Sequence, residues 1–103
     1  MTATATRIAD LLASDQIEGE VTVTGRITHV EASTTNAGDD WAVITITDNG
    51  LDVIDVELHP KVYAALRIEP CLGDIVQATG LLCLSSDDQQ LVIYGQQLDH
   101  IEH

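Results

Sequence analysis

The chain has 103 residues, 45% of them hydrophobic, and a net charge of −13 from four Lys and Arg against seventeen Asp and Glu. This length allows one hydrophobic core, and the apolar content excludes an intrinsically disordered chain. No apolar run reaches the ~18 residues of a membrane span, and residues 1–14 do not have the pattern of a signal peptide. We therefore expect a cytoplasmic protein that forms one domain over residues 1–103 and does not contact membranes.

The acidity bears directly on function. A chain this acidic repels nucleic-acid phosphates at long range, so its generic affinity for nucleic acid should be low. Three explanations stay open: adaptation to high salt, an acidic surface that binds a partner, or a small basic strip within an acidic whole.

A short helix is predicted over residues 6–14. Ile8, Leu11 and Leu12 are spaced to form a narrow apolar stripe, and Thr6 or an earlier Thr can cap the first turn. So short a helix persists only when it packs against something. We expect it to cover one end of a sheet.

The first strand is predicted over residues 19–31. Val21, Val23, Gly25 and Ile27 alternate, and Val30 has the opposite parity, so the strand changes phase. Gly25 in its middle indicates a bulge or a bend. A long bent first strand that serves two sheets is what a small closed barrel requires. A polar loop over residues 32–40 follows.

Residues 41–60 are predicted to form a hairpin around Asn49-Gly50, a pair typical of a tight type I′ turn. The period-two alternation assigns an inward face to Ala42, Ile44, Ile46, Ile54, Val56 and Leu58. The same alternation assigns an outward face to Val43, Thr45, Thr47, Val53, Asp55, Glu57 and His59.

After Pro60 the apolar period changes to that of a helix, with Val62, Tyr63, Leu66 and Ile68 on one face, and the helix should end before Pro70. Residues 74–84 form a fourth strand interrupted at Gly80. Residues 85–89 form a polar hairpin loop, and residues 90–98 form the last strand, followed by a short tail. The apolar run Leu91 to Tyr94 leaves the face of Tyr94 open.

This order of elements predicts an all-β protein: a five-stranded OB-fold Greek-key barrel over residues 19–98, with a helix between strands three and four and a short N-terminal helix. An SH3-like barrel does not have that helix, and adjacent hairpins exclude a βαβ architecture.

Several short motifs resemble the OB domain of the bacterial replicative DNA polymerase III alpha chain. Sequences of this kind also occur in anticodon-binding OB domains. The matching pieces are Val23-Thr24-Gly25-Arg26-Ile27, Gly38 with Trp41-Ala42, Asp48, Ile54-Asp55-Val56, Pro60-Lys61-Val62-Tyr63, and Asp74-Ile75-Val76 with Gly80. The resemblance implies binding of single-stranded nucleic acid through the outer face of strands two and three and the loops beside it.

The chain departs from that family at the implied binding face. Asn36 stands where the family often has Lys, and His59 where it often has Phe. Residues 39–59 contain six acidic residues and no Lys or Arg. Single-strand binding usually needs a positive groove and aromatic stacking platforms, and this face is predicted to offer neither.

The candidate residues for binding nucleic acid or a protein partner are Arg26, Thr28, His29, Trp41, Val43, Thr45, Val53, Asp55, Glu57, His59 and Lys61. Trp41 either stacks on a base or covers a barrel end. Arg26 either joins His29 and His59 in a cationic strip or pairs with Asp55 or Glu57 across strands. Tyr63 is expected in the core and Lys61 on the surface.

No catalytic or metal-binding pattern is recognisable. The sequence has no Gly-rich phosphate loop and no Ser/His/Asp or Cys/His arrangement, and His29, His59, His100 and His103 have no ligand spacing. Cys71 and Cys83 are predicted to be reduced and to pack as small hydrophobes. We expect no enzymatic activity, metal or cofactor.

Two functions stay open. The first is a stand-alone OB-fold module that binds single-stranded DNA, weakly and with a shallow salt dependence, in replication or repair. The alternative is an acidic OB-fold interaction module, or a DNA-mimic-like adaptor, whose partner is a basic replication or repair protein.

Overall fold

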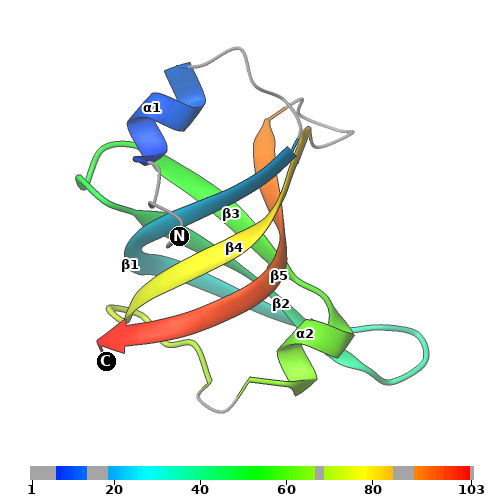
Figure 1. The fold of residues 1–103 in the computed structure, drawn as a ribbon. Coiled ribbons are helices and arrows are strands. Elements are labelled where there is room, and N and C mark those ends of the chain that lie inside the picture. Colours follow the sequence, from blue (N-terminus) through cyan, green and yellow to red (C-terminus); the bar gives the residue numbers. More distant parts are fainter. Residues whose placement is uncertain (1–6, 14–18, 67–68, 85–89, 103) are drawn as a thin grey trace.

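The strands of the protein alternate apolar and polar residues, and they close into a barrel (Figure 1). The computed structural model describes residues 7–13, 19–66, 69–84 and 90–102. Its elements are α1 (Ile8–Ala13), β1 (Gly19–Thr34), β2 (Asp40–Thr47), β3 (Val53–Leu58), α2 (Pro60–Ala64), β4 (Ile75–Leu84) and β5 (Leu91–Glu102).

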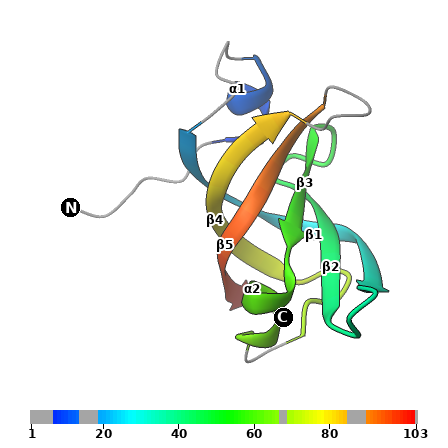
Figure 2. The ribbon, with the colours of Figure 1, turned by 90° about the vertical axis from the view of Figure 1, so that its right-hand side faces the viewer.

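The strand order around the barrel is β1-β2-β3-β5-β4, and β4 pairs back with β1. All neighbours are antiparallel except β3 and β5, which run parallel. The two short helices lie at opposite ends of the barrel, α2 in the connection from β3 to β4 (Figures 1 and 2). The predicted fold class, an all-β OB-type barrel with short helices, is confirmed.

β1 is the long strand shared by two neighbours. Its first half pairs with β4 from Gly19 to Arg26, and its second half pairs with β2 from Arg26 to Thr34. A register shift between Ile27 and His29 produces the predicted change of phase. The irregularity therefore lies after Gly25 and not at it. Gly25 instead lets β1 approach β2 closely, because a Cβ there would stand 2.7 Å from the carbonyl oxygen of Thr47.

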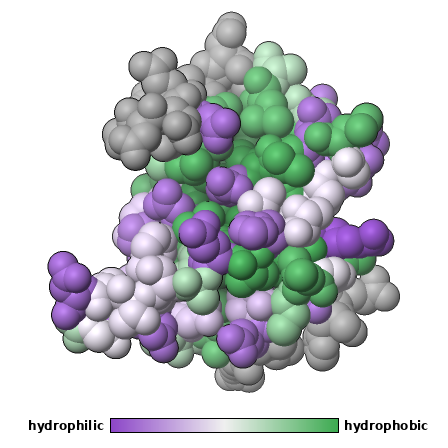
Figure 3. Space-filling view, turned by 180° about the vertical axis from the view of Figure 1, so that it is seen from behind, coloured by the Kyte–Doolittle hydropathy of each residue, from purple (hydrophilic) through white to green (hydrophobic). Residues whose placement is uncertain are grey.

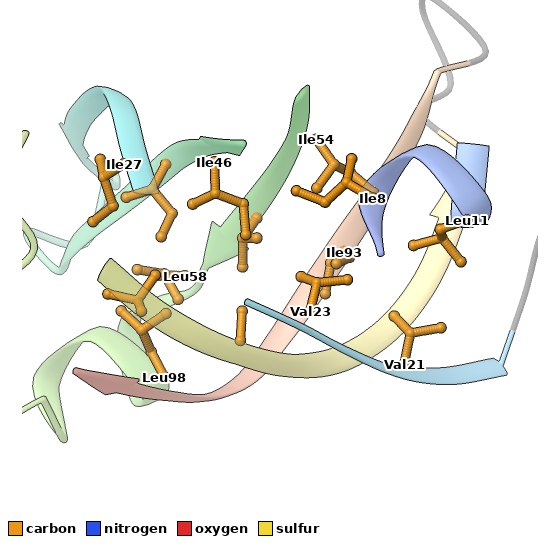
Figure 4. Close-up of a cluster of buried hydrophobic side chains, with 14 of the residues drawn as sticks. Ile8, Leu11, Val21, Val23, Ile27, Ile46, Ile54, Leu58, Ile93 and Leu98 are labelled. Carbon is orange, nitrogen blue, oxygen red and sulfur yellow. The ribbon is translucent and has the colours of Figure 1, made fainter. Parts of the chain in front are cut away.

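The predicted inward face of the β2–β3 hairpin is confirmed. Ala42, Ile44, Ile46, Ile54, Val56 and Leu58 are all buried. All of them except Ala42 join apolar side chains of β1, β4 and β5 in one continuous core (Figure 4). Burial of each large aliphatic side chain contributes roughly 1.5–3 kcal/mol relative to exposure. The core therefore fixes which face of each strand is left for function.

The connection between β2 and β3 corrects the predicted tight turn. It is a five-residue loop over residues 48–52, because pairing ends at Thr47 and Val53. Asn49 Oδ1 accepts hydrogen bonds from the amides of Leu51 and Asp52, both at 2.8 Å. Thr47 Oγ1 donates to the Asp52 carbonyl at 2.7 Å. These side-chain bonds replace the backbone pairs of a two-residue turn, and Thr47 becomes buried although it was predicted to face outward.

α1 covers the barrel end next to this loop. Ile8 and Leu11 are buried in the core, whereas Leu12 is 38% exposed, so the lid prediction is confirmed for two of its three apolar residues. The amide of Ile8 donates to Asp48 Oδ2 at 2.9 Å, so a side chain of the β2–β3 loop satisfies an amide of the first turn. The predicted cap, Thr6, lies outside the described residues.

Two element boundaries differ from the prediction. α2 ends at Ala64, well before Pro70, with Val62, Tyr63 and Leu66 packed partly against the core, and Ile68 lies outside the described residues. β5 continues to Glu102, where a tail had been predicted after Leu98. Its end pairs with the start of β4, and His100 Nε2 lies 3.1 Å from Asp74 Oδ2 in a nearly buried contact.

Candidate ligand-binding face

Three aromatic rings lie together on the outer side of β2, β3 and β5. His59, which directly follows β3, is stacked between Trp41 of β2 and Tyr94 of β5. Its ring centroid is 6.0 Å from that of Trp41, with an interplanar angle of 29°, and 4.3 Å from that of Tyr94, with an angle of 16°. We call Trp41, His59 and Tyr94 the aromatic ladder.

The strand register explains why the ladder forms. Ala42 pairs with Leu58, which sets Trp41 beside His59. Glu57 pairs with Tyr94 across the parallel β3–β5 contact, which brings Tyr94 to the other side of His59. Three positions distant in sequence thus meet on one face, at the barrel end near α2.

The ladder is accessible to a ligand. Tyr94 is 42% exposed, the His59 side chain is 37% exposed, and Trp41 is partly buried. Glu57 Oε1 lies 3.1 Å from His59 Nε2 and holds the central ring in place. Aromatic faces that reach solvent can stack a nucleobase or contact a cationic side chain.

Carboxylates border the ladder. Asp55 and Glu57 point outward from β3, and Glu31 of β1 lies level with Val43 of β2. Thr45 Oγ1 donates to Asp55 Oδ1 at 2.6 Å. On β1, Thr28 Oγ1 donates to the Thr45 carbonyl at 3.3 Å. The face therefore combines aromatic rings with acidic neighbours. The sequence predicted the acidic charge of this face but not the stacked rings.

Among the described residues, Arg26 takes neither of the two arrangements that the sequence left open. Arg26 lies level with Thr47 and His29 level with Thr45, so these two are neighbours on β1. His59 lies beside Trp41 at the other end of β2, roughly 13 Å from the level of His29. Among the described residues Arg26 forms no ion pair with Asp55 or Glu57. Arg26 instead lines a hollow of about 470 Å³ beside the β2–β3 loop, and Lys61 is exposed on α2.

The remaining predicted positions point where the alternation put them. Val43 and Thr45 are partly buried on the outer side of β2, and Val53 is 48% exposed on β3. Trp41 is partly buried and is the β2 member of the ladder.

Tyr94 is the functional candidate that the sequence did not assign. One sequence signal does favour an outward position for Tyr94, because the polar Gln96 lies two residues later and alternate residues of a strand point to the same face. Leu98 would share this face in a regular strand, but it is apolar and buried, and this conflict obscured the signal. An irregularity in the β4–β5 register, between Thr79 and Gly80, reverses the faces of β5 at this point.

Further titratable side chains lie outside the ladder. No three metal-binding side chains cluster within the described part of the chain. Cys71 is exposed, so the packing prediction fails for it, whereas Cys83 is partly buried. Burial raises the pKa of the Cys83 thiol, and the charge of Glu57 raises it further. Burial also raises the pKa of Tyr63, with added repulsion from Glu69 and Asp40.

Strand order, the position of α2 and the ladder together define an OB-type barrel with an aromatic, acid-bordered outer face. No protein-family model matches the chain, and no curated protein matches it. No helix among the described residues has the length and apolar content to cross a membrane.

Proposed function

We propose that this protein is an OB-fold binding module for single-stranded nucleic acid, with single-stranded DNA as its preferred form. The aromatic ladder carries the proposal. It occupies the outer side of β2 and β3, the side on which OB-folds bind oligonucleotides, and it supplies the stacking platform that the sequence alone did not reveal.

Binding in this proposal depends on bases and not on phosphates. Stacking of a base on an aromatic side chain contributes about 1–3 kcal/mol. The carboxylates of Asp55, Glu57 and Glu31 repel phosphates, so the backbone of the strand should lie away from β3. Affinity should therefore be modest and nearly independent of salt, because few counterions are released.

The motifs that resemble the polymerase III OB domain support a role in replication or repair, in the cytoplasm and without catalysis by the protein itself. The pairs Trp41-Ala42 and Pro60-Lys61 belong to those motifs. Trp41 is a ladder residue, and Pro60 begins the helix directly after His59. The resemblance therefore includes one ladder residue and the position next to a second, while Tyr94 lies outside the matching motifs.

The test is a titration with oligo-dT, followed by the fluorescence of Trp41, the only Trp of the chain. Tyr94→Ala should weaken binding about tenfold, the equivalent of one lost stacking contact. The matched control is Ile101→Ala, which shortens another exposed side chain of β5 and should leave the affinity unchanged. Equal affinities for Tyr94→Ala and the unmodified protein would contradict base stacking on the ladder.

Salt dependence gives a second, independent check. A plot of log affinity against log salt should have a slope no steeper than about −1, since roughly one phosphate at most is neutralised. A slope several times steeper would mean that a cationic groove, and not the ladder, holds the strand.

A second candidate is an acidic interaction module or DNA-mimic-like adaptor that binds a basic replication or repair protein. The observation that favours it is the group of outward carboxylates on this face: Glu31 and Glu57 both lie level with Val43, and Asp55 lies level with Thr45. Absence of oligo-dT binding at millimolar concentration, together with binding of a basic peptide, would select this candidate over the first.

A further inference from the structure

A hollow lies where the barrel seam between β3 and β5 opens. β3 begins at Val53 and β5 at Leu91, but their pairing starts only at Asp55 and Val92. The gap holds a hollow of about 360 Å³, which we call the seam hollow, lined by Leu12, Val53, Ile54, Asp55, Gln90 and Leu91. One of its walls is the outer side of α1, at the barrel end opposite α2 (Figure 1).

The walls of the seam hollow are apolar and reach solvent. Val53 is 48% exposed and Leu12 is 38% exposed, and Leu91 packs partly against the core. The side of the molecule opposite to the view of Figure 1 has hydrophobic side chains gathered in its upper part and hydrophilic ones across its middle (Figure 3). Exposed apolar carbon beside a charged region is suited to an amphipathic ligand group.

Asp55 gives the seam hollow its charge. The residue is partly buried, and its Oδ1 accepts a hydrogen bond from Thr45 Oγ1 at 2.6 Å. Within the described residues no cationic side chain pairs with it. A carboxylate beside apolar walls is stabilised by a cation that displaces water from it. Lys and Arg side chains combine such a cation with an aliphatic stem.

We propose that the seam hollow binds a Lys or Arg side chain from a basic protein segment. The aliphatic stem lies against Leu12, Val53 and Leu91, and the cationic group bonds to Asp55. The net charge of −13 steers basic partners toward the protein. The proposal rests on the second candidate function for its partner class, and it gives that partner a defined anchor.

The anchor is separate from the aromatic ladder. His59 lies roughly 20 Å beyond Val53 along the direction of β3. Asp55 lies nearer, roughly 13 Å from His59 along β3. A base stacked on the ladder therefore does not occupy the seam hollow, although Asp55→Asn also removes one of the carboxylates that repel the phosphates of a bound strand. The two proposals can succeed or fail independently.

The test uses the full chain, labelled with ¹⁵N, and an acetylated hexalysine peptide as probe. Asp55→Asn keeps the shape of the side chain and an acceptor for Thr45 but removes the charge. Its affinity for the peptide should fall about tenfold, the loss expected for one charge-assisted hydrogen bond. Asp99→Asn, at an exposed acid of β5, removes the same charge elsewhere and should change the affinity less than about twofold.

A second variant keeps the proposal testable if Asp55→Asn does not fold. Val53→Lys places a cation beside Asp55 on an exposed position and should block the peptide. In the unmodified protein the peptide should shift the amide signals of Leu12, Val53 and Leu91, and the peptide with all its amines acetylated should shift none of them.

Three results would overturn the proposal. Equal losses in Asp55→Asn and Asp99→Asn would indicate a general attraction to the acidic surface. Shifts confined to the ladder would place the basic partner there. Self-association that Val53→Lys abolishes would make a second copy of the chain the occupant. Oligo-dT binding by the unmodified protein and by Tyr94→Ala reports on the ladder without changing a residue of the seam hollow, so failure of the first proposed function is recognised separately.

Discussion

Replacing Gly25 tests the closest approach of two strands in the barrel. In Gly25→Ala the new Cβ would lie 2.7 Å from the Thr47 carbonyl oxygen and 3.0 Å from its carbonyl carbon, whereas ordinary contact begins near 3.4 Å. Thr47 cannot easily move away, because it is paired with Arg26 on β1 and with Val53 on β3. The strain must therefore spread into three strands.

The expected loss is about 2 kcal/mol, within the range for overpacked positions. That is a large share of the roughly 5–15 kcal/mol that holds a domain of this size folded. The melting temperature should fall by about 10 °C, followed by circular dichroism. In urea the midpoint should fall with an unchanged m value, because the surface exposed on unfolding is the same.

The control is Gly38→Asn in the β1–β2 loop. Gly38 has φ +89°, but a Cβ there meets nothing within 4 Å. Asn tolerates this backbone region, so the variant should lose no more than about 1 kcal/mol. A melting temperature for Gly25→Ala within about 2 °C of the unmodified protein would refute the close approach of β1 to β2, since strain of this kind shifts melting by several degrees.

Three further predictions concern single groups. Asp48→Ala should destabilise the fold by about 1–2 kcal/mol and speed hydrogen exchange of the Ile8 amide, because it removes the acceptor at the start of α1. Asp48→Asn keeps an acceptor and should lose less stability. The raised pKa of Tyr63 means that the folded state favours the neutral phenol. The stability that this group contributes is complete below pH ~10 and is lost as the pH rises further. In Tyr63→Phe the midpoint of urea unfolding should therefore fall less steeply with rising pH in that range. An equally steep fall in the variant would contradict this. Thiol-reactive reagents at pH ~8 should modify exposed Cys71 fast and Cys83 slowly, since burial raises the pKa of Cys83; equal rates for the two thiols, separated by mass spectrometry after proteolysis, would contradict it.

The sequence was sufficient for the parts of the fold that depend on local alternation. The inward positions of Ile44, Ile46, Ile54 and Val56 were predicted correctly, because the period-two alternation of a strand can be recognised without knowing which strand pairs with it. It was insufficient where a side chain overrides a local signal. Asn49-Gly50 favours a two-residue turn, but the bonds of the Asn49 and Thr47 side chains stabilise a wider loop.

The candidate site shows the same division. The outward position of Val53 and Asp55 was predictable, and so was the acidity of the face. The aromatic ladder was not, because it depends on the parallel register of Glu57 with Tyr94, and β3 and β5 are far apart in the sequence. The extension of β5 was missed for a similar reason: Asp99 to Glu102 show no apolar alternation, and the start of β4 keeps them in the sheet.

The position of β5 in the barrel has a consequence for synthesis of the protein on the ribosome. β5 joins β4 to β3, and its contact with β3 spans three residue pairs, from Asp55–Val92 to Glu57–Tyr94. Until residues 91–102 have left the exit tunnel, the earlier strands can form only an open trough with its apolar side uncovered. The nascent chain should therefore remain a substrate for chaperones until those residues emerge, and the barrel should then close in one late step.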